Sequence, residues 1–133
     1  MAFDVHTVTV ALGDPGGDNK QLFALCAPPD ALGGGLRLVN AYAVNGAATN
    51  SGTSFSLALH KYSNAGTPAV NGTIAAAIGG TASPWEAGVP KAFTLNSTYS
   101  FVDAGEWVVI QYNEQTAGNP TNGFVVLQYL MGK

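Results

Sequence analysis

The sequence predicts an all-β fold: a single β-sandwich or jelly-roll-like domain of about eight or nine strands with little helix. Its apolar residues fall in short runs rich in Val, Leu, Phe, Tyr and Thr, separated by clusters of Gly, Asn, Asp, Ser and Pro. Short strands at regular spacing with turn signals between them are typical of a sandwich or barrel. No extended helical pattern is present, and 133 residues suit one domain, which we place at residues 1–133.

Turn and breaker residues separate the first strands. Residues 13–19 form a turn dense in residues that accept positive φ. Pro28 and Pro29 end the second strand, because neither can donate a hydrogen bond to a ladder. Asn45 and Gly46 form a tight-turn dipeptide after the third strand. The first three predicted strands are therefore Phe3–Leu12, Gln21–Ala27 and Leu36–Val44.

The fourth strand shows a clear alternation that assigns its two faces. Phe55, Leu57 and Leu59 are predicted to face inward, and the intervening polar residues are predicted to face outward. The later segments are shorter, and flanking glycines favour a strand over a helix at the apolar run beginning at Gly72. The remaining predicted strands are Thr53–Tyr62, Gly72–Ile78, Lys91–Leu95, Thr98–Val102, Glu106–Asn113 and Gly123–Met131.

The charge content is unusually low. Charged residues make up 10% of the chain, with five Lys and Arg against eight Asp and Glu, whereas about 25% is typical of soluble domains. Nucleic-acid binding needs a row of cations, so no nucleic-acid partner is expected. A neutral exterior suits a subunit whose surface is partly covered by other subunits, although many extracellular β domains share this composition. Of the two interpretations we expect the homo-oligomer.

The sequence pattern predicts neither a membrane-spanning helix nor a signal peptide for export. Uncharged stretches such as Leu38–His60 are interrupted by polar residues and lack the ~20 mostly apolar residues of a spanning helix. The first residues show neither the cationic nor the apolar region of a signal peptide. Cys26 is the single cysteine. We therefore expect no membrane partner and folding in a reducing cytoplasm.

Few residues suit metal binding or nucleophilic catalysis. Structural zinc needs four Cys or His ligands, and the chain offers Cys26, His6 and His60 in total. Both histidines lie within predicted strands, and no Gly-x-Ser-x-Gly motif is present. We expect no metal, no cofactor and no enzymatic activity.

Two groups of carboxylates allow a second interpretation. Asp14 and Asp18, with Asn19, could bind calcium, although the same residue types are favoured simply because they form turns. Asp103 and Glu106 could be the carboxylate pair of a glycosidase. The glycine between them favours a turn that leads into a strand.

Trp85 is the aromatic residue that a strand does not account for. It lies in the predicted loop Thr81–Pro90, where its indole could fold back onto the core, anchor a partner surface or stack on a sugar. Pro84, Trp85 and Val89 are accordingly predicted as partner-contact residues. Trp107 lies in an apolar strand and is predicted to be structural.

Four segments together resemble the small all-β head proteins of tailed bacteriophages, of the decoration or cement type. The segments are Gly33–Asn45, Thr53–His60, Gly88–Phe93 and Val102–Val109. The resemblance covers most of the chain and rests on its general residue pattern and its length. It carries over no catalytic motif or functional residue. It implies a sandwich or jelly-roll subunit, commonly trimeric, on the outside of an icosahedral shell.

The resemblance leads to a structural expectation for function. We expect a capsid decoration subunit that stabilises the phage head, with the major capsid protein and sister subunits of a homotrimer as partners. Its place would be the capsid surface of the virion, after synthesis in the host cytoplasm. The alternative is a receptor- or carbohydrate-binding module of a phage fibre or tail, using aromatics such as Trp85 and Tyr42.

Overall fold

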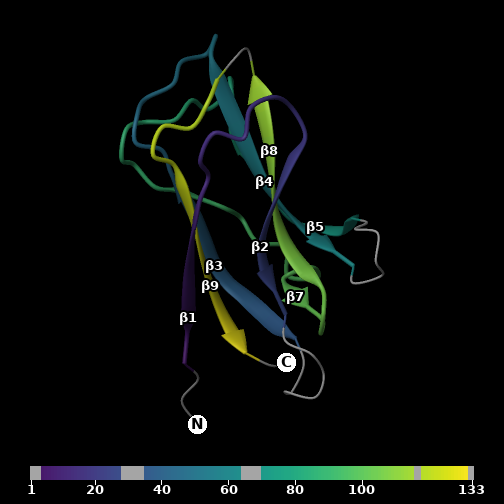
Figure 1. The fold of residues 1–133 in the computed structure, drawn as a ribbon. Helices are drawn as coiled ribbons and strands as arrows, with labels where there is room; N and C mark the ends of the chain where they lie inside the picture. Colours follow the sequence, from purple (N-terminus) through teal and green to yellow (C-terminus); the bar gives the residue numbers. More distant parts are fainter. Residues whose placement is uncertain (1–3, 28–34, 64–69, 116–117, 132–133) are drawn as a thin grey trace.

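The computed structural model describes residues 4–27, 35–63, 70–115 and 118–131. These residues form nine strands and no helix, arranged in two antiparallel sheets that pack against each other (Figure 1). The predicted all-β class is thereby confirmed. The strands are β1 (His6–Ala11), β2 (Lys20–Cys26), β3 (Leu36–Val44), β4 (Ser54–Tyr62), β5 (Val70–Gly79), β6 (Lys91–Ala92), β7 (Phe101–Val102), β8 (Trp107–Gln115) and β9 (Phe124–Met131).

The strand order is that of a jelly roll. The first sheet has the order β1-β9-β3-β6, with β7 also pairing with β3, and the second has the order β2-β8-β4-β5. Strand β1 pairs with β9, β2 with β8, β3 with β6 and β4 with β5. These are the pairs of one long hairpin folded over on itself: β1 to β4 alternate between the sheets, β5 pairs with β4 in the second sheet, and β6 returns to the first.

The strand boundaries differ most from the predictions between residues 91 and 102. The two strands predicted there shrink to two residues each, because Asn96 forms a turn between them. Its side-chain Oδ1 accepts hydrogen bonds from the backbone N–H of Thr98 at 2.8 Å and of Tyr99 at 3.3 Å. Strand β3 has its predicted bounds, and Phe3 lies outside the described residues.

The hydrophobic core lies between the two sheets. Phe55, Leu57 and Leu59 are fully buried, which confirms their predicted inward face. Ser54 and Ser56 alternate with these residues and lie on the outer face of the strand as predicted, but both are buried. For Ser54 the reason is the segment before β9, which lies directly on its backbone at Gly118. The rest of the core cluster includes Leu36, Leu38, Ala41, Ala43, Ile74, Val102, Val108, Ile110, Tyr112, Val125 and Leu127.

Hydrogen bonds hold the segment before β9 in place. The Tyr112 hydroxyl donates to the backbone oxygen of Gly118 at 2.6 Å. Burial, together with the nearby carboxylates of Glu114, Asp14 and Asp18, raises the pKa of Tyr112 to about 12. The hydroxyl is therefore protonated, and able to donate, throughout the physiological pH range.

Candidate interaction surfaces

The charged side chains of the described residues gather at the two ends of the sandwich. The register places one group at the end that holds the β3–β4 and β5–β6 connections, and the other at the end near the N-terminus (Figure 1). The first group is Asp14, Asp18, Lys20, Glu86, Lys91 and Glu114, and the second is Asp4, Arg37, Lys61, Asp103 and Glu106. The two broad outer faces are consequently almost free of charge.

The outer face of the first sheet carries an apolar stripe, which includes Val126 and Tyr42 and is flanked by hydroxyl and amide groups. Val126 pairs with Thr9 on one side and with Tyr42 on the other, so these three side chains share a face. Val126 is buried within the stripe, and Tyr42 is half-buried. Arg37 is the one charged residue on this face among those described, and its guanidinium lies 4.8 Å from the ring centroid of Phe101.

The outer face of the second sheet carries an aromatic cluster, which we define as Phe23, Tyr62 and Trp107. The Phe23 ring meets Tyr62 and Trp107 edge-on, at centroid distances of 5.5 and 5.4 Å, and Phe23 is 44% exposed. Beside the cluster, Gln21 Nε2 donates to Gln111 Oε1 at 3.3 Å. Trp107 packs in this cluster on the outer face.

Trp85 does not form an exposed contact surface. Its side chain is 1% exposed, and its ring stacks on Phe55 at a centroid distance of 5.0 Å and an angle of 16°. The indole thus folds back onto the core, and its prediction as a partner anchor is wrong. Of the other two predicted contact residues, Pro84 is half-buried and Val89 is 44% exposed.

Trp85 fits because Gly79 makes room for it and two backbone segments bind it. A Cβ atom at Gly79 would lie 2.5 Å from the indole Nε1, and Gly79 has a φ of +79°. The indole Nε1 donates to the backbone oxygen of Phe55 at 2.8 Å. The backbone N–H of Trp85 donates to Thr49 Oγ1 at 2.9 Å, and its oxygen accepts from Thr49 N–H at 3.0 Å. In the sequence, Gly79 and Gly80 indicate only the end of a strand, so they do not place Trp85 in the core.

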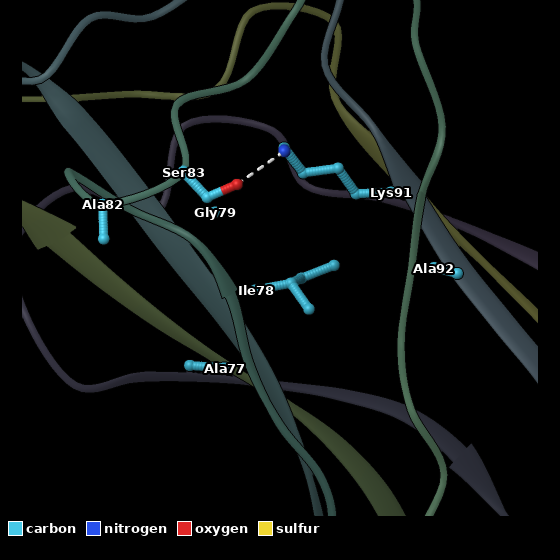
Figure 2. A pocket seen from close by; sticks show the side chains of 7 residues that line it. All are labelled: Ala77, Ile78, Gly79, Ala82, Ser83, Lys91 and Ala92. Atoms are coloured by element: carbon cyan, nitrogen blue, oxygen red, sulfur yellow. Dashed lines mark hydrogen bonds between the residues drawn. The ribbon is translucent and has the colours of Figure 1, made fainter.

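A shallow hollow of about 440 Å³ lies beside Trp85, between the edges of β5 and β6 (Figure 2). Alanines line much of it, together with Ile78. At its rim, Lys91 Nζ lies 5.9 Å from the Trp85 ring centroid and donates to Ser83 Oγ at 2.9 Å. Among the lining residues Lys91 is the single ionisable group, and it is already engaged.

Of the residues considered for chemistry, Glu106 and Asn19 take part in turns. Glu106 Oε1 accepts a hydrogen bond from the backbone N–H of Asp103 at 2.9 Å and lies 3.8 Å from Lys61 Nζ. In the first turn, Asn19 has a φ of +55° and its N–H donates to Asn113 Oδ1 at 3.0 Å. No group of three or more His, Cys, Asp or Glu in the described ranges could hold a metal ion.

Comparison of the chain with protein-family models, with curated proteins and with solved structures finds no match. In the part of the chain that the structure describes, no helix is long and apolar enough to cross a membrane.

His60 is the one side chain of the described residues that buries a polar atom without a partner. Its Nδ1 is shielded from solvent and makes no hydrogen bond. On the outer face of the second sheet it lies between Thr73 of β5 and the fully buried Val109 of β8. Burial lowers the pKa of His60 below 6.5, because the charged imidazolium loses solvation there.

Replacing Trp85 by alanine is expected to destabilise the fold by about 3–5 kcal/mol, since it removes a fully buried aromatic side chain. Urea unfolding measures this change. The matched control is Val89→Ala in the same loop, where a 44% exposed side chain is lost and a change within about 0.5 kcal/mol is expected. Equal effects of the two variants would contradict the buried position of Trp85.

The lowered pKa of His60 predicts a loss of stability on acidification. Between its folded pKa and 6.5 the unfolded chain binds the proton more readily, so the free energy of unfolding rises with pH through that window. The contribution of His60 is complete above pH 6.5 and is lost as the pH falls through the folded value. Urea midpoints at pH 7.5 and 5.5 are expected to differ less in His60→Gln than in the wild type. His6→Gln is the control, and a pH difference unchanged by His60→Gln would contradict the prediction.

Proposed function

We propose that this chain is a structural virion protein: a decoration subunit that binds the outside of an icosahedral bacteriophage head and stabilises it. Its partners are the major capsid protein and sister subunits of a homotrimer, and its place is the capsid surface. The observation that carries the proposal is the segregation of charge to the two ends of the sandwich, which leaves Arg37 as the one charged side chain on the outer faces among the described residues.

Outer faces with almost no charge suit a subunit that packs against other proteins through the broad sides of its sandwich. A specific interface covers about 800 Å² on each partner, and charged groups are depleted from interface cores because they lose solvation there. Here the half-buried Tyr42 beside Val126 and the exposed Phe23 of the aromatic cluster supply apolar contact area without that cost. The amide and hydroxyl groups beside them supply neutral hydrogen bonds, which salt does not screen.

The proposal predicts shell binding that resists salt. We expect the purified protein to co-sediment with phage shells stripped of it, at low salt and at about 0.5 M salt alike, because few charged pairs form the contact. Failure to sediment with the shells, or binding lost at about 0.5 M salt, would contradict the proposal.

Matched charge variants identify the face that binds. Asn40→Lys adds a charge to the outer face of the first sheet, and Gln21→Lys adds one to the second; both positions are exposed. Ser51→Lys is the control, since this exposed position lies in the β3–β4 turn at an already charged end. We expect one of the two face variants to weaken co-sedimentation at least tenfold and Ser51→Lys to leave it unchanged.

One observation favours a second candidate, a carbohydrate-binding module. The exposed Phe23 ring lies beside the amides of Gln21 and Gln111, and Gln111 Nε2 also donates to Asn19 Oδ1 at 3.4 Å. An apolar ring next to amide donors and acceptors complements the C–H face and the hydroxyls of a neutral sugar. This site differs from the one suggested by the sequence, since Trp85 is buried.

A glycan array separates the two candidates. The decoration proposal predicts no saturable glycan binding by the wild-type protein. Binding that Phe23→Ala weakens at least tenfold, and that the end-loop variant Val89→Ala leaves unchanged, would favour the carbohydrate-binding module instead.

A further inference from the structure

Three of the four sheet edges are protected against pairing with another strand. Strand β2 begins with Lys20 and has a register shift between Phe23 and Leu25. Strand β5 has three register shifts and is covered in its middle by an isolated bridge from Ala75 to Leu95. At the remaining edge of the first sheet, β6 and β7 have two residues each. Charges, bulges, covering segments and short strands are the usual means of protecting an edge.

Strand β1 has none of these protections in the described structure. It pairs with β9 over six residues without a register shift, and its other side pairs with no described residue (Figure 1). No charged residue and no proline occurs from Val5 to Leu12. Val5, directly before the strand, is 53% exposed. A straight, uncharged edge of this kind is a template for another extended strand.

The hydrogen bond at the end of β1 shows which backbone groups face the open side. Leu12 N–H donates to Gly123 O at 2.9 Å, continuing the β1–β9 ladder. Since successive residues of a strand direct their backbone groups to opposite sides, Val10 and Val8 also bond toward β9. The N–H and C=O groups of Thr7, Thr9 and Ala11, and of Val5 before them, therefore point to the open side.

We propose that this edge binds a second copy of the chain, with β1 pairing antiparallel to β1 across a two-fold axis at Val8. Val8 then lies opposite Val8 of the other copy, Thr7 opposite Thr9, and Val5 opposite Ala11. All outward backbone groups from Val5 to Ala11 are used, in about eight hydrogen bonds. The two first sheets join into one continuous sheet.

The edge is complementary to itself in side chains and in charge. The threonines of β1 share the outer face of the sheet, so Thr7 and Thr9 pair across the axis, which is a favourable cross-strand pair. Val8 is half-buried and packs against the core, and its remaining exposed surface is covered by its symmetry mate. Because Asp4 falls opposite Leu12, the register brings no two acidic residues face to face.

A second copy is the occupant that this pattern fits best. A two-fold contact uses one patch twice, and an antiparallel pair of identical strands satisfies that symmetry directly. The contact is independent of the proposed shell binding, because it needs no group at the capsid. It also adds to the three-fold association proposed above, since it joins different copies through a different axis.

Disulfide cross-linking tests the register. In a Cys26→Ser background, Val8→Cys is expected to form a covalent dimer under mild oxidation, since directly opposed residues of a non-hydrogen-bonded pair lie about 4.5 Å apart at Cα, within disulfide range. Val10→Cys is the matched control on the same face of the same strand. Its mate is four residues away along the strand, roughly 13 Å, so no cross-link is expected. Equal cross-linking of the two variants, or cross-linking of Val10→Cys alone, would overturn the proposal.

Sedimentation equilibrium tests the pairing itself. Thr9→Pro removes one N–H from the open side and leaves the β1–β9 ladder intact. The variant is therefore expected to lose the β1–β1 contact, and the wild-type assembly is expected to have at least twice the mass of the variant. Thr9→Ala is expected to keep the wild-type mass. Identical masses of wild type and Thr9→Pro would refute the contact, whereas co-sedimentation with shells tests the proposed function separately.

Discussion

The stacking of Trp85 on Phe55 is the contact on which the arrangement of the two sheets depends most. Loop 80–90 leaves β5 in one sheet and enters β6 in the other, so its path sets how the sheets close on that side. The Phe55 backbone oxygen accepts hydrogen bonds from both the Trp85 indole and the Gly80 N–H, at 2.8 and 2.7 Å. A buried ring with a satisfied polar atom anchors this crossing, because moving it would open a cavity and break hydrogen bonds together.

Outside this core, the positions of the charged residues determine the chemical character of the two outer faces. Each long strand runs from one charged end of the sandwich to the other. The side chains in its middle point alternately to the core and to an outer face that is almost free of charge. Lys61 and Glu106 illustrate the rule: both lie at the N-terminal end of the sandwich, where Lys61 Nζ also donates to the Phe101 backbone oxygen at 3.2 Å. Apart from Arg37, the described residues of the broad faces are thus mostly Thr, Gln, Asn and apolar residues, a composition suited to contact with other proteins.

The same topology explains why β1 differs from the other edges. A jelly roll leaves an edge on both sides of each sheet, and irregular or short strands protect three of these four edges here. Strand β1 keeps a regular register because its valines pack on the core without interruption. The regularity that stabilises β1 within the subunit is also what makes its open side suitable for a partner strand.

Composition and alternation determined the all-β class, the bounds of β3 and the inward face of Phe55, Leu57 and Leu59, because these depend on local patterns of period two. The low charge likewise followed from the sequence alone. Only the tertiary structure decided that Trp85 is core and not surface, since a loop residue shows no period and its burial depends on stacking against Phe55, which lies 30 residues away along the chain. The charge segregation and the open edge of β1 were also decided there, because both arise from which strands the topology makes neighbours.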